Sequence, residues 1–240
     1  MERKYTLIIV LTMILDISIN NSYAQENINY QMMHILPVTT RVYQAIASCS
    51  YQEFKCTQLS GDVPNALTPD SFSTRAMKFQ DWIDENSYDA ISYLCDNLLF
   101  RENIINDKAK AARKAIQNSI IDIQNSIKKY DQSKCETVCR LSCITNKLIE
   151  FDKLDEFQIG GIHDISPYHS IVKGKGVCRN FSAITTEIGN QLGIKISSEA
   201  SNLEGRHSFI SFIDNDNKQY VLDPQRDPNK TNNSCIAFPI

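Results

Sequence analysis

The sequence predicts an α+β protein in which a mostly helical layer precedes a smaller mixed core. Between residues 68 and 153, apolar side chains recur at steps of three and four residues, the period of helices that bury one face. After Gly160-Gly161 one further helical pattern is followed by three short strand-like runs. Because the last two runs flank a tight turn, we expect a helix packed on an antiparallel sheet.

The first 24 residues have the composition of a secretory signal peptide. Arg3 and Lys4 precede an apolar run from Thr6 to Leu15, and Ser22-Tyr23-Ala24 is a small-x-small cleavage sequence. The alternative is an uncleaved membrane anchor, but an apolar run of about ten residues is half of the roughly 20 that span a bilayer. We therefore predict removal of residues 1–24 and a secreted or periplasmic mature chain without a membrane span.

The mature chain divides into three predicted parts. Residues 25–67 contain Pro37, Pro64 and the turn-like Gly61-Asp62, so we expect an irregular segment with a short helical pattern around residues 42–47. Residues 68–159 are predicted to form a helical region with disulfides, and residues 160–240 the catalytic core. The clearest helix of the second part spans about 106–130, and the next spans about 133–153.

Eight cysteines in a chain with an export signal indicate disulfides. Cys135, Cys139 and Cys143 recur every four residues and so lie along one helix face. One zinc ion bridges two such thiols but hardly all three, because the outer pair lies about 12 Å apart along the axis. We expect disulfides from this helix to the region between Cys49 and Cys95. If Cys178 is free, the seven others, which also include Cys56 and Cys235, leave at least one unpaired or bonded to another chain.

Charge and histidine placement argue against several functions. The formal net charge of −3 and the lack of a basic stripe with interleaved aromatic residues argue against a nucleic-acid partner. His34, His163 and His169 form no recognisable ligand spacing with a cysteine or a carboxylate. We therefore predict neither a metal site nor a cofactor.

The catalytic core begins with a predicted helix over 178–191, where Phe181, Ile184, Ile188 and Leu192 follow helical steps and Gly193 can end the helix. Strands are predicted over 195–201, 207–213 and 219–222. The run Asp214-Asn215-Asp216-Asn217 is strong turn chemistry and predicts a hairpin between the last two strands.

Cys178, His207 and Asp223 follow one another in the order of a known kind of catalytic triad. A thiol attacks an amide carbon well only as a thiolate, an imidazole can take its proton, and a carboxylate can orient that imidazole. The predicted helix starts at the cysteine, so its free N–H groups would stabilise a thiolate and the oxyanion that follows attack. Gly174 and Gly176 are expected to allow a tight turn and to leave room for substrate backbone.

Around this triplet the chain carries the runs Gly176-Val177-Cys178, Phe181, Leu192-Gly193-Ile194, His207-Ser208-Phe209 and Leu222-Asp223-Pro224. Together they resemble the core of the transglutaminase-like superfamily over about residues 168–226. That resemblance implies a papain-like fold in which Cys178 is the nucleophile, His207 the general base and then acid, and Asp223 the orienting residue. Phe209 stands where many relatives have Trp, and Tyr168 and His169 lie upstream as unassigned candidates for a second oxyanion donor. The calcium sites of the family are not recognisable here.

Taken singly, each of the three residues is more often structural, but their order and surroundings together favour a catalytic site. We predict an exported thiol enzyme that acts on protein or peptide amides through an acyl-enzyme. Hydrolysis, deamidation and amine transfer all remain open, as does the oligomeric state. The alternative is a catalytically inactive binding module on the same core. An arylamine N-acetyltransferase shares the triad order, but the export signal argues against it, because acyl-CoA donors are cytosolic.

Overall fold

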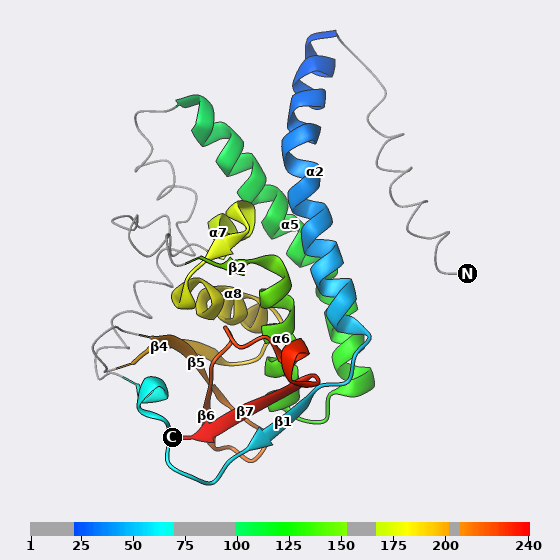
Figure 1. Ribbon diagram of the computed structural model, residues 1–240. Helices are drawn as coiled ribbons and strands as arrows, with labels where there is room; N and C mark the ends of the chain where they lie inside the picture. The colour runs from blue at the N-terminus through cyan, green and yellow to red at the C-terminus, as the bar shows by residue number, and fades with distance from the viewer. Residues whose placement is uncertain (1–21, 70–98, 153–166, 202–206) are drawn as a thin grey trace.

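A computed structural model describes residues 22–69, 99–152, 167–201 and 207–240 (Figure 1). Helices occupy one part of the molecule and a five-stranded sheet lies at the other end. The predicted mixture of helix and sheet is confirmed. The part of residues 68–98 predicted to be helical falls almost wholly outside the described residues. Within the described ranges no helix is long and apolar enough to cross a membrane.

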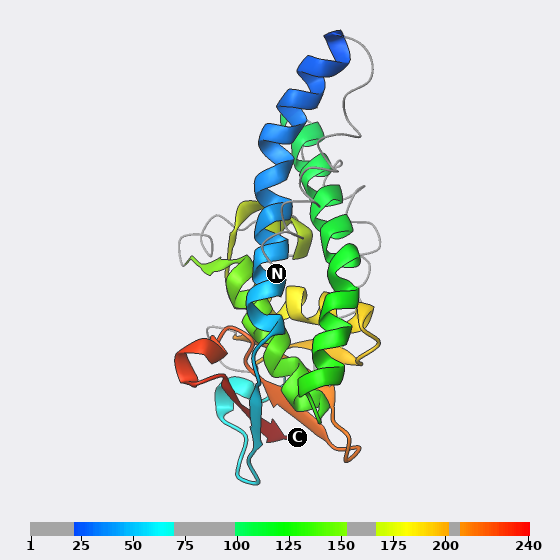
Figure 2. The ribbon, with the colours of Figure 1, turned by 90° about the vertical axis from the view of Figure 1, so that its right-hand side faces the viewer.

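Two long helices, α2 (Ser22–Ser50) and α5 (Leu99–Tyr130), lie side by side in both ribbon views (Figures 1 and 2). The prediction of an irregular segment over 25–67 is wrong for its first half, because α2 continues through Pro37. A proline inside a helix removes one backbone hydrogen bond. Apolar packing outweighs that cost: a stripe on α2 is buried against the core at helical steps, formed by Val38, Val42, Ala45, Ile46 and Cys49.

Helix α6 (Lys134–Leu148) begins and ends at identifiable signals. The Ser133 hydroxyl accepts from the backbone N–H of Glu136, and the Glu136 carboxylate accepts from the backbone N–H of Ser133, so the two form a capping box. The helix ends at Leu148 instead of near residue 153. Ile149 is already extended, and the short strand β2 (Glu150–Phe151) follows, paired in parallel with β3 (Lys175–Gly176).

The sheet has the order β1-β7-β6-β5-β4. Strands β4 (Ile196–Ala200), β5 (Ser208–Ile213) and β6 (Gln219–Leu222) agree with the predicted strands within one residue. They pair antiparallel, and the predicted hairpin joins β5 to β6. Strand β7 (Ser234–Pro239) adds antiparallel to β6, and β1 (Lys55–Gln58) adds parallel to β7; neither was predicted.

The main core lies between the sheet and the helices. Helix α8 (Cys178–Gln191), whose bounds agree with the prediction, packs on β4 and β5, and α6 packs beside it. Gly189 allows this close approach, because a β-carbon there would lie 2.3 Å from Ile196 Cδ1. A smaller cluster of Phe209, Val221 and Leu67 is buried separately; Leu67 belongs to the short 3-10 helix η1 (Asn65–Leu67).

Three disulfides connect α6 to three other elements. Cys143 bonds Cys49 at the end of α2, and Cys135 bonds Cys56 on β1, as expected for disulfides to the region from Cys49 onward. The expectation is wrong for Cys139, which bonds Cys235 on β7. The reason is that β1 and β7 are paired with Cys56 opposite Cys235, so cysteines one turn apart on α6 reach both strands. Cys95 lies outside the described residues.

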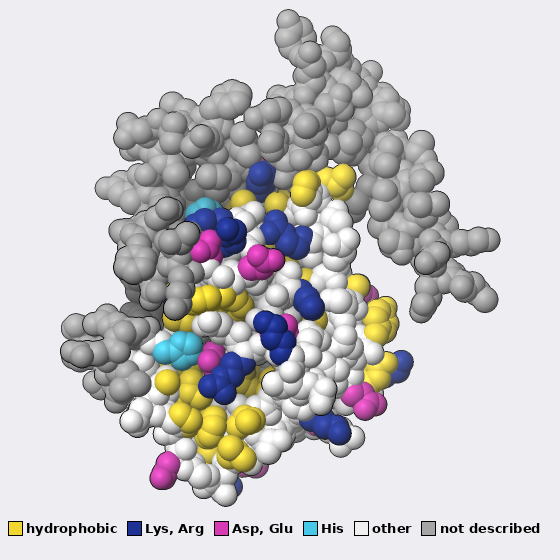
Figure 3. Space-filling model, viewed as in Figure 1, with side chains coloured by type: hydrophobic (Ala, Val, Ile, Leu, Met, Phe, Trp, Pro, Cys, Tyr) yellow, Lys and Arg dark blue, Asp and Glu magenta, His cyan; other side chains and the backbone are white. Residues whose placement is uncertain are grey.

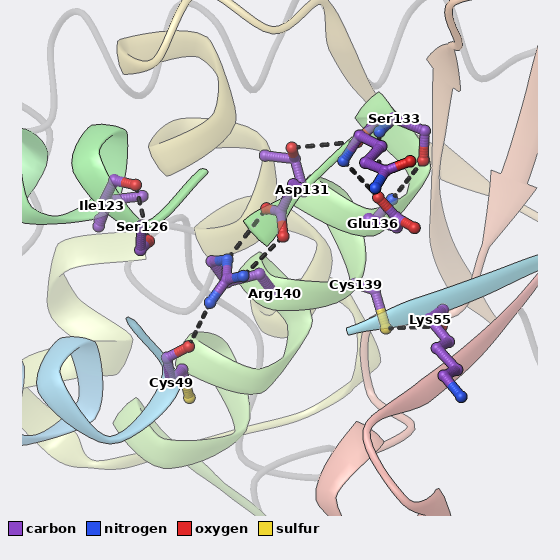
Figure 4. A network of polar contacts seen from close by, with 11 residues as sticks. Cys49, Lys55, Ile123, Ser126, Asp131, Ser133, Glu136, Cys139 and Arg140 are labelled. Carbon is purple, nitrogen blue, oxygen red and sulfur yellow. Dashed lines mark hydrogen bonds and ion pairs between the residues drawn. The ribbon is translucent and has the colours of Figure 1, made fainter. Parts of the chain in front are cut away.

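A buried ion pair joins α6 to the segment that precedes it (Figure 4). The side chain of Arg140 is fully buried and makes two hydrogen bonds, of 2.6 and 3.0 Å, to the carboxylate of Asp131. Its remaining terminal nitrogen donates to the backbone oxygen of Cys49 at 2.6 Å. The guanidinium also lies 4.9 Å from the centre of the Phe54 ring. Because its charge is paired with Asp131 and its terminal nitrogens are hydrogen-bonded, Arg140 fixes the position of α6 relative to the end of α2, close to the Cys49–Cys143 disulfide.

Candidate functional site

The segment before α8 is shaped by two glycines and one asparagine. Gly174 has φ of +75°, a left-handed conformation that ends α7 (Pro167–Lys173) and supports the predicted tight turn. Gly176 has a different role from the one expected. A β-carbon at this position would lie 2.6 Å from Asn180 Cβ, so the space is filled by a neighbouring side chain and is not left for a substrate.

Cys178 is the first residue of α8, and it is the free cysteine among those that the structure describes. Its side chain is partly exposed. No hydrogen bond within the described ranges engages the backbone N–H groups of Cys178 and Arg179. These groups are therefore available at the positive end of the helix dipole, where they can stabilise negative charge on a thiolate or on an oxyanion.

His207 and Asp223 lie at one end of the β5–β6 hairpin, the first just before β5 and the second just after β6. The backbone of His207 is held by Ser201, whose hydroxyl accepts from the N–H of His207 at 3.0 Å and whose N–H donates to the oxygen of His207 at 2.7 Å. One carboxylate oxygen of Asp223 accepts from the N–H of Gln225 at 3.1 Å. Hydrogen bonds to neighbouring residues thus hold the backbone of His207 and the carboxylate of Asp223 in place.

The three predicted residues come together in the structure. His207 Nε2 lies 3.0 Å from the second carboxylate oxygen of Asp223, and the ring also forms a hydrogen bond with the Cys178 side chain. The bond to Asp223, followed by the bond to Cys178, raises the pKa of His207 from 6.5 to about 10. Because Nε2 faces the carboxylate, Nδ1 is the ring nitrogen left to receive the thiol proton.

This arrangement has the chemistry of an activated nucleophile. A protonated imidazole is the neighbour that best stabilises a thiolate, and a carboxylate on the far side of the ring keeps it charged and oriented. The imidazole of His207 lies between the Cys178 thiol on α8 and the Asp223 carboxylate at the end of the hairpin, and it interacts with both. The geometry therefore suits general base and then general acid chemistry at the imidazole.

Tyr168, one of the two unassigned oxyanion candidates, is placed elsewhere. Its hydroxyl donates to Glu187 at 2.5 Å and accepts from the side chain of Gln191 at 3.0 Å. Glu187 is nine residues after Cys178, or about 14 Å further along α8. The Tyr168 hydroxyl is therefore excluded as the second oxyanion donor.

Three residues that the sequence reasoning missed support the site. Asn180 bonds the segment before Cys178. Asn146 on α6 donates to the backbone oxygen of Pro224, directly after Asp223, at 2.8 Å. The Nε of Arg226 lies 3.6 Å from the same Asp223 oxygen that faces His207, although its side chain is 77% exposed. Only Asn180 gave a signal in the sequence, as the third residue of a helix, a position that often bonds back to the cap.

The surface of this face is mixed (Figure 3). Basic and acidic side chains lie interspersed around the histidines, and hydrophobic side chains gather toward the end of the molecule that holds the sheet. Neither sign of charge dominates the view. The surface alone therefore selects no substrate charge.

Fold and site together bring a free cysteine at the start of a helix to a histidine and an aspartate at one end of a β-hairpin. A family model described as a transglutaminase-like domain matches residues 100–236, more than half of the chain. The chain belongs to this family, which confirms the resemblance, and the match extends well beyond residues 168–226. No curated protein and no solved structure matches the chain.

Proposed function

We propose that the protein is an exported thiol enzyme that acts on carboxamide groups of proteins or peptides through Cys178, His207 and Asp223. The observation that carries the proposal is the double engagement of His207, which bonds both the thiol and the carboxylate. His207 is thus placed between a thiol and a largely buried carboxylate, the arrangement that general base chemistry at the imidazole requires. Membership in the transglutaminase-like family adds support.

The reaction follows from the positions of the protons. The Cys178 thiolate attacks the amide carbon, a C–S bond forms, and the oxyanion is held by the free N–H groups at the start of α8. His207 gives its proton to the leaving nitrogen, the C–N bond breaks, and an amine or ammonia departs. Water attack on the thioester then gives an acid, whereas attack by a second amine gives a new amide; in both cases His207 takes the proton of the attacking group and the thiolate is restored.

We also propose the organisation that accompanies this function. Residues 1–24 are removed on export, residues 68–159 form a helical region, and residues 160–240 form a papain-like catalytic core. The three disulfides support a secreted or periplasmic location, because paired thiols persist in oxidising compartments. The proposed substrate partner is a protein or peptide with a reactive amide.

The test compares ammonia release and amine incorporation on a glutamine-containing protein. We expect Cys178→Ala to abolish both activities and Asp223→Ala to lower kcat by about 10²- to 10⁴-fold, the usual contribution of general acid-base catalysis, because it removes the group that orients His207. Asp216→Ala is the matched control, since this carboxylate lies in the hairpin turn with Lys218 and Tyr220. Unchanged activity in Cys178→Ala would exclude the proposed chemistry, and no activity in the native chain would favour the inactive binding module.

A further inference from the structure

We propose that Asn180 is a positioning residue of this site, and the proposal rests on the function assigned to Cys178. The side chain of Asn180 is buried, with 3% of the residue exposed. Its amide oxygen accepts from the backbone N–H of Val177 at 2.8 Å, and its amide nitrogen donates to the hydroxyl of Ser170 on α7 at 2.8 Å. One side chain therefore ties the residue before the nucleophile to the preceding helix.

Gly176 shows how closely this side chain is fitted. A β-carbon on Gly176 would lie 2.6 Å from Cβ and 2.9 Å from Cγ of Asn180. Both distances are too short for real carbon atoms, so a larger residue at 176 would displace the asparagine. The glycine two residues before the thiol is thus required by Asn180, and the pair sets the path of the chain into α8.

The consequence for the site comes from the backbone groups at the helix start. The oxygen of Val177 accepts from the N–H of Asn180 at 2.8 Å and from that of Phe181 at 3.3 Å, while the N–H of Val177 is held by the Asn180 side chain. The backbone N–H and C=O of Val177 are therefore both hydrogen-bonded, whereas the N–H groups of Cys178 and Arg179 have no hydrogen bond within the described residues. Asn180 therefore determines which backbone N–H groups at the start of α8 are free, and it sets the position of the Cys178 backbone that carries the sulfur.

Without the amide, the N–H of Val177 would be buried with no acceptor. The turn would move to satisfy this donor, and Cys178 would move with it. The hydrogen bond between Cys178 and His207 would then weaken, and with it the second cause of the raised histidine pKa. Asn180 thus acts on the reaction through the sulfur and does not touch the reacting atoms itself.

The same geometry gives a structural role to one sequence motif. Asn180-Phe181-Ser182 is a sequon for N-linked glycosylation. The amide nitrogen that a glycan would occupy is buried and already donates to Ser170. The asparagine of this motif therefore serves the fold and the site, and no glycan fits there in the native structure.

The experiment measures alkylation of Cys178 by iodoacetamide against pH in the full mature chain with its disulfides intact, with the site confirmed by peptide mass spectrometry. We expect Asn180→Ala to slow alkylation near neutral pH about tenfold and to move the profile about one unit to higher pH, because the thiolate fraction changes tenfold per unit. Asn180→Asp keeps an acceptor for Val177 and should recover only part of the rate, because the added carboxylate charge disfavours a nearby thiolate. Asn190→Ala, on the exposed last turn of the same helix, is the matched control.

A merely structural role would lower the amount of folded protein without moving the profile, so an unshifted profile in Asn180→Ala would overturn the proposal. If that variant does not fold, Ser170→Ala, which removes the hydroxyl that accepts from the Asn180 amide, should shift the profile in the same direction, and no shift there would equally overturn the proposal. The function itself is tested separately by His207→Gln. A native profile identical to that of His207→Gln would refute the thiol–imidazole pair, whereas a difference there with no effect of Asn180 would refute the positioning role alone.

Discussion

The three disulfides should differ in how much each adds to the free energy of unfolding, because the loops that two of them close are nested. Cys56–Cys135 lies inside Cys49–Cys143, so when one of these bonds is present, the loop that the other closes spans only the sequence separation of seven from 49 to 56 and that of eight from 135 to 143. Cys139–Cys235 has no such shortcut and closes a loop of 96 residues. In the chain-entropy description, a loop of about 15 residues stabilises by about 3 kcal/mol and one near 100 residues by about 4.7 kcal/mol.

The perturbation is therefore the replacement of each cysteine pair by alanine. We expect loss of Cys139–Cys235 to lower the free energy of unfolding by about 1.6 kcal/mol more than loss of Cys49–Cys143. These two pairs are compared because all four sulfurs are buried, so the packing that alanine removes is similar. Urea unfolding followed by circular dichroism measures the difference.

The nested pair gives a sharper test, since the two losses should not add. Removing either bond costs about 3 kcal/mol while the other remains, but removing the second then opens the full loop and costs about 4.5 kcal/mol more. Equal costs for all three single removals, or additive costs for the nested pair, would refute the loop argument. Peptide mapping without reductant identifies the disulfides that remain in each variant.

Three further outcomes follow from the polar contacts. Arg140→Met should lower the free energy of unfolding, measured by urea denaturation, by about 3 to 5 kcal/mol, because it leaves Asp131 buried without its partner. Lys129→Met, at an exposed position, is the control, and equal effects of the two substitutions would contradict a stabilising role of the ion pair. Asp214→Ala should cost about 1 to 2 kcal/mol in the same assay, since one Asp214 oxygen accepts from the first N–H groups of α6 at 2.9 and 3.2 Å, whereas Asp214→Asn should cost less. The pKa of His207 is raised in the folded state, so its contribution to stability should be complete below about pH 6.5 and disappear as the pH approaches about 10. The difference in unfolding free energy between the native chain and His207→Gln should therefore shrink as the pH rises from about 6.5 to about 10. A difference that grows would contradict a protonated His207 in the folded state.

Local patterns predicted the elements that local residues determine. Helix α8 has a strong apolar period and a glycine stop, and the β5–β6 hairpin has a four-residue turn with Asn217 at φ of 61°. Helix α2 was missed because Pro37 interrupts its pattern, and only packing against α5 shows why the helix continues. Strand β1 was missed because its residues are almost all exposed, and its parallel partner lies about 180 residues away in the chain.

The same limit applies to the candidate site. The order and spacing of Cys178, His207 and Asp223 were enough to select these three residues, which lie together in the structure. Their catalytic roles stay a prediction. The sequence offered no means to place Cys139 against Cys235, because that bond depends on the pairing of β1 with β7. It also suggested Tyr168 as an oxyanion donor from distance along the chain alone, whereas the side chain turns toward the far end of α8.

Helix α6 holds the β5–β6 hairpin at both extremities. Its first N–H groups bind Asp214 at the tip, and Asn146 in its last turn binds the backbone of Pro224 at the base. Helix α6 therefore supports the segment that carries Asp223 without being part of the proposed site. If Cys178, His207 and Asp223 act as proposed, we expect reduction of the three disulfides on α6 to shift this support and to lower activity.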